Sequence, residues 1–535
     1  MRKNRTQLRP HSSSTGSNPT RREVLRGVAA SALLPTAVLP TVRRSSNDPL
    51  DVAIVGGGVS GCYAAWRLAN AGSSKESIRI FERGDRIGGR LYSVPCKGLT
   101  EQVAELGGMR IAENQTPLLG LVQTLGLETE PYPATEPDDL YYIRGIRTKA
   151  RDLVCNEKAG FRPRPELEGK DPDEVFNILM KKLTGREDWT VAEFQAARKS
   201  MTYRGKNLYE LPYEYAFREA LGSEGFKFFF RTSGYGRPNV QALSFIEEAT
   251  LSIFVENYYH VRGGYDQVPK RLAAAAGDKG VEVEFGTTLV DLRLDSDGLV
   301  RMTFDEKASP SRTVRARKAI LAIPNTAYDL LDPAGALGGD NGMSRANRAL
   351  EPDPAVKIYS NYGTQWWKPL GIRTGRSITD LPTRQCFYLP DPTGGGLVLA
   401  PYGSGPRATS YWRPLLQPSA PNQLDPSGLA AQAIQNQLSQ LHGLEVPQAR
   451  EILYRSFEGG YDGYAWNMWR PGNRYWEIVE EARTPLPGKP ISCIGQATAT
   501  SQGWVMDTLA SAEAVMQKTY GLGRPDWWPA DYPIG

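Results

Sequence analysis

The chain has 535 residues, of which 40% are hydrophobic and 23% are charged, with 54 Gly and 39 Pro. This composition is close to the average of soluble globular proteins and excludes a disordered or fibrous chain, and the length suffices for about three domains. The formal net charge is +5, but nine of the 64 basic residues and one of the 59 acidic residues lie in residues 1–47. The rest of the chain therefore has more acidic than basic residues, which argues against nucleic-acid binding.

The cysteines and histidines give no sign of a disulfide framework or a metal site. The five cysteines are widely spaced and form no C-x-x-C pair, and the chain has three histidines, which lie far apart. Small disulfide-rich domains and zinc sites need closely spaced ligands in larger numbers. We therefore expect no metal.

Residues 1–47 are predicted to be an export signal and linker. Arg21 and Arg22 precede a small and apolar run at 27–39. That run is shorter than the roughly 20 helical residues that cross a bilayer. Paired arginines before a modest apolar stretch are typical of the twin-arginine signal, which export machinery reads on proteins that are already folded. We expect an exported protein, periplasmic or secreted, with cleavage between about residues 37 and 46.

The next segment has the pattern of a dinucleotide-binding unit. Residues 51–55 form a short apolar strand, the run G-G-G-V-S-G follows at 56–61, and an Ala-rich helix continues to residue 71. A second strand at 77–82 ends in an acid. Glycines allow a pyrophosphate to approach the helix N-terminus, and the acid can accept hydrogen bonds from ribose hydroxyls. The residues assigned to the cofactor are Gly56, Gly58, Ser60, Gly61 and Glu82.

The run R-I-G-G-R at 86–90 resembles the corresponding element of the flavin amine oxidase superfamily. In that family the element places backbone amides and arginine charge along FAD. The resemblance covers almost the whole chain after residue 50. It implies an α/β protein with α+β elements, in which a Rossmann-like FAD-binding domain is joined to a mixed-sheet substrate domain and a helical lid domain.

The resemblance also implies domain boundaries. The FAD-binding domain is expected at 50–94, 265–350 and 484–520, and the substrate-binding domain at 95–150, 241–264 and 351–483. Residues 151–240, rich in Glu, Lys, Ala and Leu, are expected to form the helical domain. An aromatic tail follows at 521–535.

Two further motifs narrow the substrate. The run E-L-G-G-M-R at 105–110 resembles an element of L-amino-acid oxidases, in which Arg110 holds the substrate carboxylate through two parallel bonds. The segment 357–390 is similar to the same family over its length, which implies that Tyr388 is a second carboxylate ligand. It also implies that Lys357 is a catalytic residue that holds a water near flavin N5. The alternatives are a surface ion pair for Arg110, a core aromatic for Tyr388 and a solvated amine for Lys357.

The segment 495–504 resembles the family's closing flavin element, in which the Gly503 carbonyl faces the substrate amine and Trp504 walls the pocket. Gln496 stands where members usually have an acid, and the absence of Cys from this element implies noncovalent FAD. Trp466 and Trp469 fall where the family builds the side-chain pocket, although they can equally fill core. The cofactor contacts that the resemblance adds are Arg83, Gly89, Arg90, Gly108, Met109, Arg110, Val290, Gly495, Gln496 and Trp504.

The motifs together predict an exported FAD-dependent L-amino-acid oxidase. The enzyme would convert an L-amino acid, O2 and water into a 2-oxo acid, ammonia and hydrogen peroxide, by hydride transfer to flavin N5 and hydrolysis of the imino acid. Two other enzymes stay open: an oxidase or dehydrogenase of amines without a carboxylate, and an amino-acid 2-monooxygenase. A flavin-carrying binding protein without turnover is a further alternative. A homodimer is also left open by the sequence.

Overall fold

Two large β-sheets organise the chain. The computed structural model describes residues 48–535 apart from 73–76, 237–239, 254 and 307–308. The predicted export signal at 1–47 lies outside the described residues. Residues from Pro49 onward form one compact unit.

The first sheet has seven strands in the order β12-β2-β1-β15-β14-β13, with β26 also paired to β15. The strands β12, β2, β1, β15 and β26 run parallel, while β13, β14 and β15 form an antiparallel meander. Nucleotides bind beyond the carboxyl ends of such parallel strands. The bounds are β1 Leu50–Val55, β2 Ile78–Glu82, β12 Glu282–Phe285, β13 Thr287–Leu294, β14 Val300–Glu306, β15 Ser309–Leu321 and β26 Ile491–Cys493.

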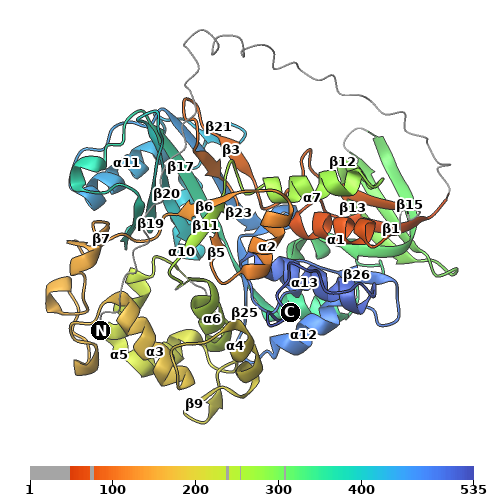
Figure 1. Cartoon of the computed structure of the whole chain (residues 1–535), viewed down its shortest axis with the longest axis horizontal. Helices are drawn as coiled ribbons and strands as arrows, with labels where there is room; N and C mark the ends of the chain where they lie inside the picture. Colours follow the sequence, from red (N-terminus) through yellow and green to blue (C-terminus); the bar gives the residue numbers. More distant parts are fainter. Residues whose placement is uncertain (1–47, 73–76, 237–239, 254, 307–308) are drawn as a thin grey trace, which may run out of the picture. The chain divides into compact units, whose positions relative to one another are not determined.

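Both faces of this sheet are buried, which is why β1 is apolar at almost every position. Val52 and Ile54 pack in one core with α1 (Val59–Asn70), α7 (Gln267–Gly277) and α13 (Val505–Lys518), and these three helices lie together in Figure 1. Ala53 and Val55 point to the opposite face, into a core that also contains residues of α9 (Gly342–Ala349) and α12 (Tyr475–Arg483).

The second sheet has ten strands in the order β21-β22-β23-β17-β20-β19-β18-β7-β8, with β24 paired to β23. Successive side chains of β17 alternate between two cores. Val356 and Ile358 pack with α11 (Leu429–His442), while Tyr359 points to the other face. The bounds are β7 Leu140–Ile143, β8 Ile146–Lys149, β17 Ala355–Tyr362, β18 Gly375–Thr379, β19 Gln385–Pro390, β20 Gly396–Ser404, β21 Pro418–Ala420, β22 Gln423–Leu424, β23 Glu451–Gly459 and β24 Gly463–Tyr464.

A group of helices follows β8 in the sequence. The helix α3 (Pro172–Thr184) begins with a capping box between Asp171 and Glu174 and packs on α5 (Tyr213–Thr232). The helix α4 is Val191–Ala197, and α6 (Ala242–Glu248) continues directly into a π-helical turn at Ala249–Ile253. Helical structure therefore runs past the expected boundary at residue 240.

The remaining elements are short and connect these parts. They are β3 Ser93–Pro95, β4 Val103–Glu105, β5 Ile111–Ala112, β6 Thr129–Tyr132, β9 Thr202–Tyr203, β10 Lys206–Asn207, β11 Tyr258–Val261, β16 Leu350–Asp353, β25 Trp466–Trp469, α2 Thr116–Thr124, α8 Asn325–Tyr328 and α10 Pro406–Trp412.

The predicted fold class is confirmed: the structure is mixed α/β with a nucleotide-type parallel sheet and a second mixed sheet. The strands of the first sheet come from 50–82, 282–321 and 491–493, inside the three predicted pieces of the FAD-binding domain. The domain boundaries themselves stay predictions. No helix in the described part of the chain has both the length and the apolar character needed to cross a membrane.

Candidate active site

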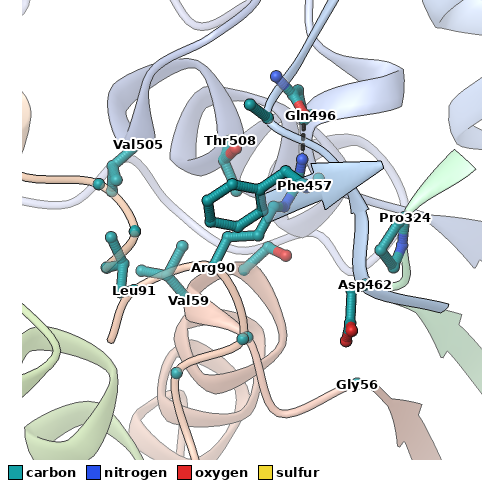
Figure 2. A pocket seen from close by; sticks show the side chains of 18 of the residues that line it. Gly56, Val59, Arg90, Leu91, Pro324, Phe457, Asp462, Gln496, Val505 and Thr508 are labelled. Carbon is teal, nitrogen blue, oxygen red and sulfur yellow. Dashed lines mark hydrogen bonds between the residues drawn. The ribbon is translucent and has the colours of Figure 1, made fainter. Parts of the chain in front are cut away.

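A cavity of about 410 Å³ lies between the two sheets and is lined by residues of both. Its walls come from the turn between β1 and α1, the end of β2, the strands β17 and β23, and the start of α13. Figure 2 shows part of this cavity, with Gly56 and Val59 below Arg90, and Gln496 and Thr508 above it. A cavity of this kind, with converging charged groups, is typical of a small-molecule site.

The glycine turn shapes one end of the cavity. Gly56 has a φ of +106°, and a Cβ on Gly61 would lie 2.0 Å from the Gly56 carbonyl oxygen. Gly61 does not line the cavity, so its role is to let α1 pack close to the turn. No side chain caps α1, whose positive end opens beside Gly58 and Ser60 in the cavity wall.

Glu82 ends β2 at the edge of this turn. Its carboxylate accepts hydrogen bonds from the Gly57 amide at 2.7 Å and the Gly84 amide at 2.6 Å. These bonds fix the carboxylate in the cavity wall, as the predicted ribose contact requires. Arg83 lies beside it and forms an ion pair with Asp462 at 2.6 Å.

Three guanidinium groups line the middle of the cavity: Arg86, Arg90 and Arg455. In the described part of the chain, none of them forms an ion pair with a carboxylate. Arg90 donates to the Tyr464 carbonyl oxygen and to Gln496 Oε1. Half-buried cations without acidic partners are unfavourable until an anion binds. This cluster, next to an uncapped helix N-terminus and a glycine turn, fits the diphosphate of FAD.

Arg110 is at the other end of the cavity and is 5% exposed. Its Nη2 donates to the Tyr235 hydroxyl at 2.9 Å, and its guanidinium lies 3.8 Å from the centre of the Tyr258 ring. Trp504 stacks on Tyr258 and lies 5.8 Å from the same guanidinium. Within the described residues Arg110 has no acidic partner, so a buried cation in an aromatic cage faces the cavity.

Lys357 reaches the cavity from β17 and is 3% exposed. Its Nζ donates to the carbonyl oxygens of Gly107 at 2.6 Å and Glu105 at 3.1 Å. Burial lowers the pKa of Lys357 well below its ordinary value, and the Glu105 carboxylate opposes this shift. The two carbonyl bonds leave one ammonium proton for a further acceptor.

The prediction that Tyr388 binds the carboxylate is wrong. Tyr388 is fully buried on the other side of β19, where its hydroxyl lies 2.7 Å from Ser377 Oγ and 2.6 Å from His442 Nε2. Neighbouring side chains on a strand point to opposite faces, so it is Phe387 that faces Arg110, with the guanidinium 5.9 Å from its ring centre. The phenol at Arg110 is supplied by Tyr235 instead.

Trp469 and Val290 are also outside the cavity lining. Trp469 is fully buried, donates to the Thr500 carbonyl oxygen at 2.8 Å and stacks on Tyr475, so it fills core. The Val290 carbonyl oxygen accepts from the Asp332 amide at 2.8 Å, and the preceding residues 287–289 line the cavity in its place.

The other predicted site residues do come together. Trp466 lines the cavity and its Nε1 donates to the Gly503 carbonyl oxygen at 3.1 Å, so this carbonyl already has one partner. The predicted residues found in the lining are Gly56, Gly58, Ser60, Glu82, Arg83, Gly89, Arg90, Gly108, Met109, Arg110, Lys357, Trp466, Gly495, Gln496, Gly503 and Trp504. Their assigned roles stay predictions.

Sequence reasoning missed several residues of the cavity. Tyr235, Glu248 and Tyr402 lie in the lining near Arg110 and Lys357. Glu248 is 3% exposed and directly precedes the π-helical turn, a feature that is frequent at functional sites. None of these residues belongs to a local motif. In the described residues no group of three or more His, Cys, Asp or Glu could hold a metal ion.

Comparison with known proteins agrees with this geometry. The sequence profile of the family "Flavin containing amine oxidoreductase" matches residues 59–515. The chain belongs to this family. It is therefore an oxidoreductase, and FAD is its cofactor.

Relatives with a known name are similar over most of their length. The chain is 25% identical to the L-amino acid oxidase bordonein-L of Crotalus durissus terrificus over 478 residues, covering 87% of this chain and 86% of that protein. It is 24% identical to achacin of Lissachatina fulica over 533 residues, covering 93% of this chain and 97% of that protein.

Solved structures share the fold. Putrescine oxidase bound to putrescine aligns with a TM-score of 0.67 and 19% identity, covering 89% of this chain and all of that chain. Cyclohexylamine oxidase from Brevibacterium oxydans IH-35A aligns with a TM-score of 0.64 and 18% identity, covering 88% of this chain and all of that one.

Proposed function

We propose that this flavoenzyme is an L-amino-acid oxidase. The observation that supports this substrate class is Arg110, a buried cation that faces the cavity and has no acidic partner among the described residues. A guanidinium in this setting binds a carboxylate through two parallel charge-assisted bonds. An amine without a carboxylate would leave the charge of Arg110 buried and uncompensated, which is costly.

The residues around Arg110 suit the handling of an amino acid. Arg110 and the Tyr235 hydroxyl hold the carboxylate, while the rings of Tyr258 and Trp504 exclude water from it. The Gly503 carbonyl can accept a hydrogen bond from the neutral substrate amine, whose lone pair assists departure of the Cα hydrogen. Bound FAD supplies the acceptor for that hydride. Lys357, fixed by two backbone carbonyls, directs an ammonium proton toward the cavity.

The named relatives also favour an amino-acid substrate, since bordonein-L is described as an L-amino acid oxidase. The second candidate is an oxidase of amines without a carboxylate, which the fold shared with putrescine and cyclohexylamine oxidases leaves open. The third candidate is an amino-acid 2-monooxygenase, which the reaction products distinguish from an oxidase. An oxidase yields a 2-oxo acid and hydrogen peroxide, whereas a 2-monooxygenase yields an amide.

Replacing Arg110 tests the substrate class. Arg110→Ala is expected to weaken transition-state binding of L-amino acids by about 2–5 kcal/mol, because one partner of a buried charge pair is removed. This is a loss of roughly 30-fold to several thousand-fold in kcat/KM. The measurement is flavin bleaching and peroxide formation with a panel of L-amino acids and with the corresponding decarboxylated amines.

The decarboxylated amines are the control, since they offer nothing for Arg110 to bind. Their rates should change far less than those of the amino acids, with the same FAD content in both proteins. If the amines and the amino acids lose equally, Arg110 does not hold a carboxylate, and the amine-oxidase alternative becomes the better interpretation.

We also propose that the chain is exported by the twin-arginine route. The support is Arg21 and Arg22 before the short apolar run, together with a nucleotide cofactor that must be inserted before a folded protein crosses the membrane. Replacing both arginines by lysine keeps the charge and should leave yellow, folded protein in the cytoplasm. Replacing Arg43 and Arg44 by lysine is the matched control. Undiminished export of the Arg21/Arg22 variant would refute the proposal.

A further inference from the structure

Arg455 lies in the cofactor cavity but belongs to no motif of the sequence. It is on β23, directly opposite Lys357 of β17, so both side chains project from the same face of the second sheet. Its Nη1 donates to the Gly89 carbonyl oxygen at 3.3 Å, and its guanidinium lies 4.8 Å from the centre of the Phe457 ring. An arginine of the second sheet thus contacts the R-I-G-G-R run at 86–90, which follows β2 of the first sheet.

Arg455 joins two other arginines there. Arg86 donates to the same Gly89 carbonyl oxygen at 2.7 Å, so the two guanidinium groups converge on one acceptor. Burial lowers the pKa of Arg455 to about 10, with Arg86 as the next contributor. Burial also lowers the pKa of Arg90 to about 10, with Arg455 as the next contributor. The charge of Arg86 therefore opposes the charge of Arg455, and the charge of Arg455 opposes that of Arg90.

Two acids of the cavity wall, Asp462 and Glu82, already have other partners. Asp462 pairs with Arg83, and both oxygens of Glu82 accept backbone amides. Gln496, which occupies the place of the family's usual acid, offers Arg90 a neutral oxygen. Within the described residues Arg86, Arg90 and Arg455 form no ion pair. A cluster of like charges that is half-closed from solvent is stable when an anion occupies it.

We propose that Arg455 binds an anionic part of FAD and completes a three-arginine site with Arg86 and Arg90. Two parts of FAD have this chemistry: the diphosphate, and the flavin ring once it carries negative charge on reduction. The proposal rests on the family's cofactor and not on the amino-acid substrate. It makes FAD a bridge between the two sheets, because Arg86 and Arg90 follow β2 whereas Arg455 comes from β23.

The test compares variants of the full-length holoprotein. Arg455→Met keeps an unbranched apolar stem and removes the charge, and Arg455→Lys restores a charge. Arg413→Met is the matched control, since Arg413 is 74% exposed and pairs with Glu458 of the same strand. Free flavin after serial dilution and ultrafiltration gives the FAD dissociation constant, and a dye-coupled titration gives the flavin midpoint potential.

A contact with the diphosphate predicts at least tenfold weaker FAD binding in Arg455→Met, with the potential unchanged. A contact with the ring predicts a lower potential, because reduction would lose a stabilising charge. In either case Arg455→Lys should recover part of the change and Arg413→Met should match the parent. The proposal is overturned if Arg455→Met matches the parent in both quantities, or if Arg455→Lys is as impaired as Arg455→Met while its circular dichroism and melting temperature are those of the parent.

Discussion

The phenol of Tyr388 and the phenol of Tyr235 illustrate how one residue's position decides its role. Tyr388 bridges Ser377 and His442 in an apolar core, whereas Tyr235 meets Arg110 at the cavity. The first arrangement stabilises the fold and the second contacts the substrate's carboxylate in our proposal. Removing each hydroxyl in turn therefore compares a structural role with a role in binding.

We predict that Tyr388→Phe lowers stability and spares catalysis. Removing this hydroxyl leaves His442 Nε2 without its partner, at a cost of about 1–3 kcal/mol in the free energy of unfolding. The KM for L-amino acids should stay within about twofold of the parent. Tyr235→Phe should show the reverse pattern, a raised KM with little change in urea unfolding. A raised KM in Tyr388→Phe alone would return Tyr388 to the site.

At the scale of elements, two glycines in the turn between β1 and α1 have different roles. A Cβ on Gly61 would lie 2.0 Å from the Gly56 carbonyl oxygen, whereas a Cβ on Gly58 would meet no protein atom within 4 Å. Gly58 lines the cavity and Gly61 does not. Gly61 is thus required for the packing of α1 against the turn, whereas Gly58 leaves space for a ligand in the cavity.

This difference predicts opposite outcomes for two otherwise identical substitutions. Gly61→Ala should lower the free energy of unfolding by about 1–3 kcal/mol, because α1 must move away from the turn. Gly58→Ala should leave the stability of the flavin-free protein within a few tenths of a kcal/mol and still weaken FAD retention. Thermal melts with and without added FAD measure both effects. Normal FAD retention by Gly58→Ala would show that the cofactor does not approach this turn closely.

The elements also show where the sequence is informative. The cofactor runs at 56–61, 86–90 and 495–504 are local, so their residues could be placed without knowing the fold. The strand β19 is buried on both faces, and no alternation of polar and apolar residues indicates which side faces the cavity. That is why the sequence alone points to Tyr388 and not to Phe387. Arg455 and Tyr235 reach the cavity through long-range packing and have no local signal.

For the whole molecule, His442 is expected to make stability depend on acid. Burial lowers the pKa of His442 from 6.5 to about 4. As the pH falls, the unfolded chain therefore binds a proton at this histidine before the folded chain does. The stability that comes from keeping His442 neutral is fully present above pH 6.5 and is lost as the pH falls toward 4. This lowers the free energy of unfolding by about 3 kcal/mol. Urea unfolding of the parent and of His442→Gln, measured from pH 7 to pH 4, isolates this component. Parallel curves for the two proteins would contradict the expectation.

The way in which the cavity is assembled has a consequence for biosynthesis. The first lining residues in the sequence are 55–60 and the last are 495–508. About 435 residues must therefore be translated after the first group before the last group begins. At ~5–20 residues per second this delay is roughly 20–90 s. A nascent chain therefore has no complete binding site for FAD, and the cofactor is captured only after the ribosome has made α13. Cells short of riboflavin should accordingly accumulate full-length colourless protein rather than stalled fragments.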